Sequence, residues 1–276
     1  MPDRPAAASV AIPERGLAEA AAGYATQMLA VAETEMLKLR HDPTEIFTRA
    51  LQPAIWLLLF GQVMAHVRGL DAGGGHYLDF LAPGILALSV LFAAIFYAIS
   101  AIWERDLGIL HRYMVSPAPR SALVPGKAVS SAVRGLLQAV VVYVLSVLMG
   151  IGVSFNPLDL IGVSALIALG SGLFATFSLC VACIVKTRER FMGIDQVLTM
   201  PIFFASNAIY PIDIMPDWLK AVSLANPLSY EVDALRAFML AGGESKFGAG
   251  LDFAVLLGLT AGLVAVAARL YPRMTA

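Results

Sequence analysis

The chain has 276 residues, of which 59% are hydrophobic and 14% charged. Soluble domains usually carry about 25% charged residues, so the composition excludes an ordinary soluble domain and indicates a chain that crosses a lipid bilayer several times. The formal net charge of -1 is uninformative by itself, and we expect no nucleic-acid partner.

The residues before the first long apolar run predict two cytoplasmic elements. Residues 1–16 are rich in Pro and Ala and lack a basic start followed by an apolar stretch, so we expect a disordered tail and not a cleaved signal peptide. Residues 17–49 carry apolar side chains every three to four positions, up to a break at Asp42-Pro43. This pattern predicts an amphipathic helix, which lies either flat in the membrane interface or against a partner protein.

Six apolar stretches follow, and a helix needs about 20 mostly apolar residues to cross the hydrocarbon core. The expected membrane-spanning helices are 50–67, 78–103, 133–153, 158–185, 191–210 and 251–270. The fifth carries Asp195 and Gln196 near its start. The sequence therefore predicts an all-α integral membrane protein whose membrane domain covers residues 50–276.

The distribution of basic residues predicts the orientation of these helices. Of 19 Lys and Arg residues, four fall on one side of the predicted membrane, namely Arg68, Lys220, Arg236 and Lys246, which leaves 15 on the other side. Since cytoplasmic loops are enriched in Lys and Arg, we expect a multi-pass protein of the bacterial plasma membrane with both termini in the cytoplasm.

A short charged segment, ERDLGILHRYMVSP, separates the second and third predicted spans. Leu107, Leu110 and Met114 share one helical face, and Ser116-Pro117 ends the pattern. Residues 104–116 are therefore predicted to form a short cytoplasmic helix. Its apolar stripe is covered either by the bundle and lipid headgroups or by a partner protein.

Residues 212–243, after the fifth span, predict an outer helical hairpin. Pro216 suits the first turn of a helix, Asn226-Pro227 forces a turn, and Gly242-Gly243 ends the second helix. Both helices are too short to span, so we expect a re-entrant or interfacial hairpin that is buried in protein or lines a cavity.

Several polar residues in or near the spans are candidates for function. Asp195 is expected to face a cytoplasmic vestibule or to pair with Arg188 or Lys186. In the hairpin, Asp233 and Arg236 at i, i+3 predict an internal ion pair, with gating or substrate contact as the alternative. The possible pathway residues are Asp195, Gln196 and Asn207. Cys180 and Cys183 have no further ligands nearby, so we expect no metal site.

Two stretches resemble the membrane subunits of type-2 ABC exporters. ERDLGILHRYMVSPAPR is similar to the segment after the second span in that family, and SNAIYPIDIMPDWLKAVSLANPLSYEVDALR is similar to its outer loop. Together with the six-span layout, the resemblance covers the chain from about residue 17. The subgroup that it resembles is that of the daunorubicin-resistance and lipooligosaccharide exporter permeases.

The resemblance implies a mechanism and a set of site residues. Two permease chains, identical or different, pair above two copies of a separate ATPase subunit, which holds ATP and Mg while this chain holds no cofactor. The residues that would couple the chain to the ATPase are Glu104, Arg105, Leu107, Gly108, Leu110, Arg112, Tyr113 and Met114. The residues of the outer hairpin or gate would be Tyr210, Pro211, Pro216, Trp218, Asn226, Pro227, Tyr230, Glu231 and Arg236.

Catalytic motifs are absent from the sequence. No G-x-x-x-x-G-K-[ST] occurs, so we expect no ATP hydrolysis by this chain and no enzymatic activity. The implied function is ATP-driven export of an amphiphilic substrate, such as a drug, a lipid or a lipid-linked glycan, by alternating access. The alternatives are a self-sufficient secondary transporter or channel, which usually shows internal repeats, and an intramembrane enzyme.

Overall fold

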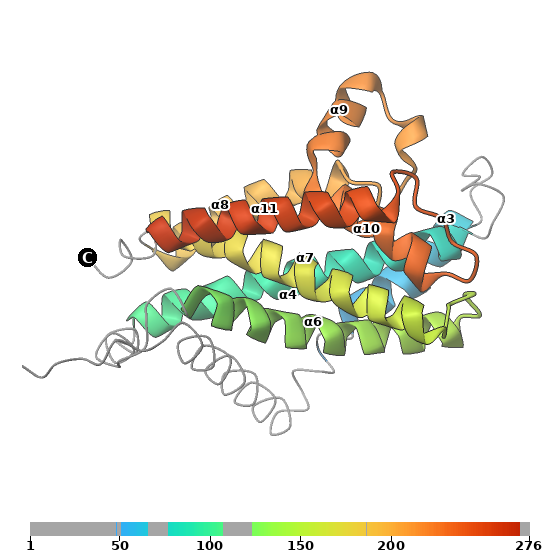
Figure 1. Ribbon diagram of the computed structural model, residues 1–276, viewed down its shortest axis with the longest axis horizontal. Coiled ribbons are helices and arrows are strands. Elements are labelled where there is room, and N and C mark those ends of the chain that lie inside the picture. The colour runs from blue at the N-terminus through green and yellow to red at the C-terminus, as the bar shows by residue number, and fades with distance from the viewer. Residues whose placement is uncertain (1–47, 49–50, 66–76, 107–122, 186, 271–276) are drawn as a thin grey trace, which may run out of the picture.

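The computed structural model describes residues 48, 51–65, 77–106, 123–185 and 187–270 (Figure 1). The described elements are helices, and the one β-bridge among them joins Val153 to Leu240. The long helices run side by side along the long axis, while α9 (Asp217–Ala225) stands out from the flank of this bundle (Figure 1). The long helices are α4 (Tyr77–Asp106), α6 (Leu123–Leu148), α7 (Pro157–Ile184), α8 (Arg188–Phe204) and α11 (Ala249–Leu270). The all-α prediction is confirmed for this part of the chain.

The N-terminal apolar helix, Leu51–Met64, contains the π-helical turn η1 (Trp56–Gly61) and continues into α3 (Gln62–Ala65). It packs on α4 at Gly61, where an added Cβ would lie 2.7 Å from a methyl group of Leu78. The Trp56 ring also contacts Phe203 of α8, with the ring centroids 5.6 Å apart. This helix is the described part of the predicted first span.

The longest helix is α4 (Tyr77–Asp106), which forms the centre of the bundle together with α7. It continues through Glu104 and Arg105, so the predicted boundary at residue 103 is wrong. The first residues of the predicted cytoplasmic helix prolong the second span instead of starting a new helix. An unbroken run of helix-compatible residues has no signal that would end the helix earlier.

Helices α6 (Leu123–Leu148) and α7 (Pro157–Ile184) form the next pair. The third span was predicted at 133–153, but its helix begins ten residues earlier and ends before Gly150, whose φ of 75° is left-handed. The Asn156 side chain caps α7 by accepting a hydrogen bond from the Leu158 amide, and Pro157 takes the first helical position.

Helix α8 (Arg188–Phe204) ends six residues before the predicted boundary at residue 210. Residues 205–211 are irregular, and residues 205–209 are at most 8% exposed. They are followed by η3 (Ile212–Ile214), α9 (Asp217–Ala225), α10 (Pro227–Met239) and α11 (Ala249–Leu270). The two short helices predicted around Asn226 are therefore present as α9 and α10.

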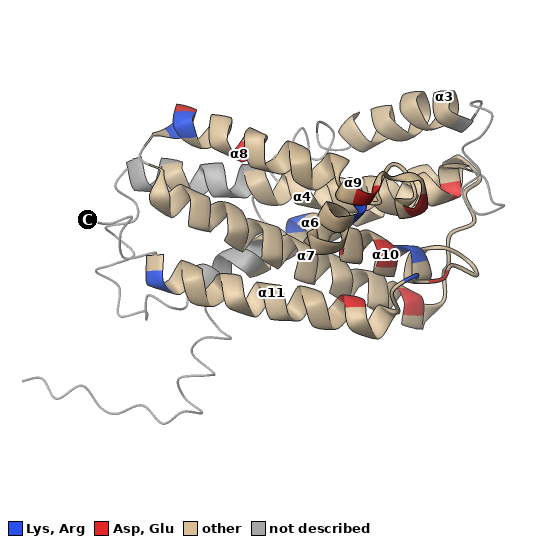
Figure 2. Cartoon of the chain, turned by 90° about the horizontal axis from the view of Figure 1, so that it is seen from above, with Lys and Arg blue, Asp and Glu red and all other residues tan. Residues whose placement is uncertain are grey.

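Four helices in the described part of the chain are long and apolar enough to cross a membrane, in α4, α6, α7 and α11. Leu51–Met64 and the 17-residue α8 fall short of that length. Basic side chains lie at the start of α8 and the end of α11, whereas acidic ones gather around α10 and the start of α11 (Figure 2). The chain is thus a multi-pass membrane protein in which many of the acidic side chains lie toward the α10 end.

Candidate functional site

The coupling residues Leu107, Gly108, Leu110, Arg112, Tyr113 and Met114 lie outside the described residues, as do residues 1–47. The N-terminal amphipathic helix and most of the cytoplasmic helix therefore stay predictions. The candidate site that can be built from contacts is the junction between the helical hairpin (residues 212–243) and the bundle.

The irregular segment 205–211 is held against α4. The Tyr77 hydroxyl donates to the Ile209 carbonyl at 2.8 Å. At Gly84 an added Cβ would lie 2.2 Å from the Ala208 carbonyl oxygen, so only a glycine lets the two backbones approach this closely. Helix α8 stops at Phe204, and the chain then continues beside α4 as an irregular segment that is buried in protein.

The hairpin turn is attached to the end of α8 by Asn226. Its Oδ1 accepts from the Leu228 amide at 3.0 Å, which caps α10, and its Nδ2 donates to the Ile202 carbonyl at 2.6 Å. The predicted gate residue Tyr230 donates to the Leu224 carbonyl at 2.7 Å, and Tyr210 donates to the Phe204 carbonyl. These three side chains therefore hold the backbone of the hairpin.

Arg236 joins α10 to the irregular segment and to α4. Its Nη2 donates to the Asn207 carbonyl, and with the Asn207 amide oriented to satisfy both of its partners, Nη1 donates to the side-chain oxygen at 3.2 Å. The guanidinium carbon lies 3.8 Å from the centroid of the Phe80 ring. The predicted Asp233–Arg236 pair is wrong, because Asp233 accepts from Ser245 and the Phe247 amide instead.

Arg236→Lys is expected to destabilise the protein by about 1–3 kcal/mol. A lysine keeps the charge but cannot reach both oxygens of Asn207 and stack on Phe80 with a planar group. Thermal unfolding in detergent measures this loss. Arg190→Lys, on the exposed face of α8, is the matched control and should change the melting temperature little; equal losses in the two variants would refute the role given to Arg236.

Glu231, also on α10, faces α7. Glu231 is 0% exposed, and neither of its carboxyl oxygens has a hydrogen-bond partner. Gly170 of α7 provides the space, since an added Cβ there would lie 2.1 Å from Oε1. A buried carboxylate without partners costs far more than a neutral acid, so this burial favours the neutral form of Glu231.

Helix α9 projects from the bundle and exposes apolar side chains. Trp218 is 69% exposed, and Val222 and Leu224 are also exposed. Pro216 is the N-cap of α9 and Pro227 the first residue of α10, whereas Pro211 precedes η3. Of the predicted hairpin residues, Asn226 and Glu231 are thus buried, whereas Pro216 and Trp218 are exposed.

The three predicted pathway residues do not come together. Asp195 is 5% exposed and accepts hydrogen bonds from Ser178, at 3.3 Å, and Thr199, instead of pairing with Arg188. Gln196 lies on the exposed face of α8, and Asn207 lies beyond the end of that helix. Asp195 therefore joins α8 to α7 and is not paired with Arg188, whereas Lys186, the other predicted partner, lies outside the described residues.

Lys246 and Asp213 form an exposed ion pair between the α10–α11 segment and η3, with Nζ 2.5 Å and 2.6 Å from the two carboxylate oxygens. The hydrogen bond from Lys246, then its charge, lowers the pKa of Asp213 below its ordinary value. A lowered carboxyl pKa adds stability above the unfolded-state pKa, and this contribution is lost as the pH falls through the folded-state value.

Lys246→Met should therefore cost less than about 1 kcal/mol at neutral pH, as exposed pairs do. The melting temperatures of variant and wild type should begin to converge as the pH falls below about 4 and should coincide below the lowered pKa of Asp213. Glu244→Gln, at an exposed neighbour, serves as control. A constant difference across the acidic range would show that the ion pair is not its cause.

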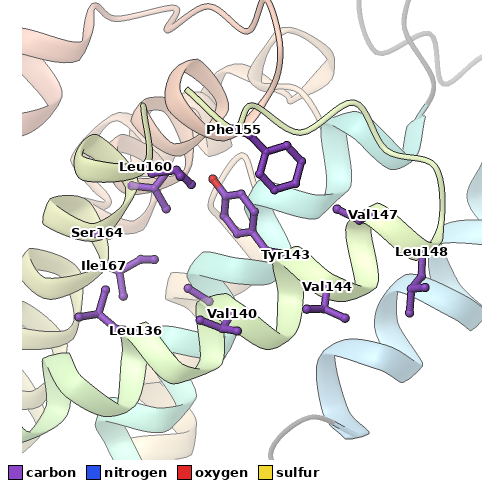
Figure 3. A pocket seen from close by; sticks show the side chains of 12 residues that line it. Leu136, Val140, Tyr143, Val144, Val147, Leu148, Phe155, Leu160, Ser164 and Ile167 are labelled. Carbon is purple, nitrogen blue, oxygen red and sulfur yellow. The ribbon is translucent and has the colours of Figure 1, made fainter. Parts of the chain in front are cut away.

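An apolar groove of about 680 Å³ lies between α6 and α7 (Figure 3). Its lining includes Val140, Val144, Phe155 and Ile167, and the Tyr143 side chain lies between the two helices with its hydroxyl toward Phe155 and Leu160 (Figure 3). The groove can take a hydrocarbon chain but has few groups that could bind a polar one. Sequence reasoning missed it, because apolar side chains in spans carry no signal of a hollow.

Comparison with known proteins agrees with this architecture. Residues 26–240 match the model of the ABC-2 type transporter family. The chain is 27% identical over 218 residues, 77% of its length and 74% of the relative's, to a putative transport permease, ycf38, of Cyanophora paradoxa. It is 27% identical over 241 residues, 87% of its length and 82% of the relative's, to the daunorubicin resistance ABC transporter permease protein DrrB1 of Streptomyces coeruleorubidus.

A third relative, nodulation protein J of Rhizobium leguminosarum bv. trifolii, is 27% identical over 191 residues, 68% of this chain and 71% of that protein. The family match covers most of the chain, including the hairpin junction described above. The protein belongs to the ABC-2 type transporter family and is a membrane-spanning permease subunit.

Proposed function

We propose that this chain is the permease of an ATP-driven exporter that moves an amphiphilic substrate across the plasma membrane by alternating access. The observation that carries the proposal is the attachment of the outer hairpin to the bundle by Gly84, Asn226 and Arg236 in a chain of the ABC-2 family. Helix α10 packs against neighbouring spans and thereby closes one end of the bundle. A displacement of α10 would open that end.

The proposed topology has six spans with both termini in the cytoplasm. The irregular backbone of residues 205–209 supports counting α8 as the fifth span, because it is buried in protein, as backbone at membrane depth must be. Basic residues at the start of α8 and at the end of α11 support the orientation (Figure 2). The region around the hairpin is then extracytoplasmic, and residues 212–243 act as a re-entrant cap.

A second permease chain, identical or different, would complete the path. The faces that support this pairing are the exposed apolar sides of Leu51–Met64, α8 and α9, with Leu59, Val197 and Trp218 as examples. The ATPase would be a separate subunit, present in two copies, with ATP and Mg bound to it and no cofactor on this chain. The proposed substrate class is amphiphilic, and the apolar groove between α6 and α7 supports it.

The test is reconstitution with the ATPase subunit, which would be sought first among neighbouring genes that encode a P-loop protein. Co-purification of the two chains, and ATP turnover that changes on association, is the expected result. No association and no change in turnover would overturn the proposal. Flux driven by an ion gradient in liposomes that contain this chain alone would favour a self-sufficient secondary transporter instead.

A further inference from the structure

The segment between α10 and α11, residues 244–248, binds three elements through adjacent residues. Lys246 pairs with Asp213 of η3. The Phe247 amide donates to Asp233 of α10 at 2.9 Å, and the Phe247 ring lies 5.2 Å from that of Tyr230. This segment therefore couples the position of the hairpin to the start of α11.

The hydroxyl of Ser245 lies between two buried carboxyl groups. Its Oγ is 2.9 Å from Oδ2 of Asp233 on α10 and 2.8 Å from Oδ2 of Asp252 on α11. It also accepts a hydrogen bond from the Gly248 amide at 2.8 Å. Asp233 is 3% exposed and Asp252 is 0% exposed.

A serine hydroxyl has one hydrogen and two lone pairs. It can donate to only one of the two carboxyl groups, and the other would then place an oxygen lone pair against the lone pairs of Oγ. If one carboxyl carries a proton, that proton donates to Oγ, the Gly248 amide uses the second lone pair, and the hydroxyl donates to the remaining carboxylate. All hydrogen-bonding positions of Ser245 are then used.

The other partners of the carboxyl groups identify the protonated one. Oδ2 of Asp233 accepts a second hydrogen bond, from the Phe247 amide. Oδ1 of Asp252 is buried and has no partner. Since an ionised carboxylate needs donors when it is buried, the charge belongs on Asp233 and the proton on Asp252.

We propose that Asp233, Ser245 and Asp252 form a proton-binding site that ties α10 to α11. With the proton bound to Oδ2 of Asp252, the three groups form a continuous chain of hydrogen bonds. When the proton leaves, two carboxylates compete for one hydroxyl hydrogen, one contact to Ser245 is lost, and residues 244–248 separate from α10 or α11.

The charged side chains around Asp252 do not provide a positive charge that could stabilise its carboxylate in place of the proton. Asp233 is the charged group whose field acts on Asp252. Arg236 interacts with Asp233 but donates to Asn207, and Lys246 is paired with Asp213. Glu244 is exposed. The described residues therefore supply no ion pair to a charged Asp252.

Release of the segment should follow the pH on the side of the membrane that the hairpin faces. That this side is extracytoplasmic rests on the proposed function, whereas the proton site itself does not. An acidic medium would hold α10 and α11 together, and a rise in pH would loosen them.

The test is hydrogen exchange of the Phe247 and Gly248 amides in the full chain in lipid nanodiscs, across a pH series. The wild type is compared with Asp252→Asn at each pH, because the intrinsic exchange rate then cancels. In the variant, an amide N–H replaces the carboxyl O–H as donor to Oγ. Above the pH at which Asp252 loses its proton, the protection factors of the two amides in the wild type should fall relative to those in the variant. The fall should be up to about tenfold per pH unit, because the release of one proton is linked to the opening of the segment.

Asp217→Asn, on the exposed start of α9, is the matched control and should behave as the wild type. Equal protection of wild type and Asp252→Asn at every pH would overturn the site. Protection that depends on the Na⁺ concentration at constant pH would assign the site to an alkali cation and would also overturn it.

If Asp252→Asn fails to fold, infrared spectroscopy of the wild type and of Ser245→Ala tests whether Asp252 is protonated. Glu231 and exposed acids also contribute C=O bands at acidic pH, so the diagnostic signal is a component of the C=O band that shifts in Ser245→Ala. The absence of any such shift would overturn the proposal. None of these measurements uses transport or the ATPase. A negative result would therefore contradict the proton site but not the proposed function, and a failure of the chain to bind the ATPase would contradict the proposed function but not the proton site.

Discussion

Gly84→Ala is expected to lower the melting temperature of the protein by several degrees. The added Cβ would lie 2.2 Å from the Ala208 carbonyl oxygen and 2.8 Å from its carbonyl carbon, and backbone atoms cannot rotate away as a side chain can. Either α4 or segment 205–211 must shift, which costs about 1–3 kcal/mol or more. For chains of this size, 1 kcal/mol corresponds to about 2–4 °C.

The matched control is Gly262→Ala, in α11. It makes the same chemical change in a helix, but nothing lies within 4 Å of the added Cβ. Alanine favours a helix over glycine by up to about 1 kcal/mol, so this variant should be as stable as the wild type or slightly more stable. Thermal unfolding of both variants in the same detergent measures the difference, and an unchanged melting temperature for Gly84→Ala would refute the tight contact.

Gly108→Pro is expected to abolish ATP-driven transport while the protein still folds and inserts. Residue 108 lies in the predicted cytoplasmic helix, and proline in a helix interior removes a backbone hydrogen bond and costs about 3 kcal/mol locally. A broken helix could not transmit movement of the ATPase to α4, which continues to Asp106 just before it. The measurement is substrate flux in proteoliposomes with the ATPase, together with the melting temperature and the membrane-inserted yield.

Gly108→Ala is the control for this prediction. Alanine preserves or strengthens a helix, so transport should be retained. Normal transport by Gly108→Pro would contradict a coupling role for residues 104–116. Loss of transport in both variants would mean that the position requires glycine itself, for close approach or for its backbone freedom, and would not assign the effect to a broken helix.

Much of the hairpin could be predicted from local sequence signals. Asn226 followed by Pro227 specifies a helix start whatever surrounds it, because the cap and the fixed φ of proline act within a few residues. The same holds for Asn156-Pro157 at the start of α7. The long apolar runs in α4, α6, α7 and α11 were also predicted, because a membrane-spanning helix needs only length and hydrophobicity.

Helix ends and side-chain partners were less predictable. Hydropathy does not show where α8 ends, since residues 205–209 are as compatible with a span as those before them. They leave the helix because Gly84 lets the chain approach α4 and because Tyr77 and Arg236 satisfy the freed carbonyl groups. The i, i+3 spacing of Asp233 and Arg236 suggested an ion pair, but each side chain found partners more than ten residues away.

The sequence by itself determined that this protein is a bundle of membrane helices with a short helical hairpin, because hydrophobic length and Asn-Pro turns act locally. Only the tertiary structure decided that α10 is buried while α9 is exposed, that Glu231 lies against Gly170, and that Ser245 bridges two carboxyl groups. The physical reason is that burial and hydrogen-bond partners depend on which distant segments share the same space, and no local pattern encodes that arrangement.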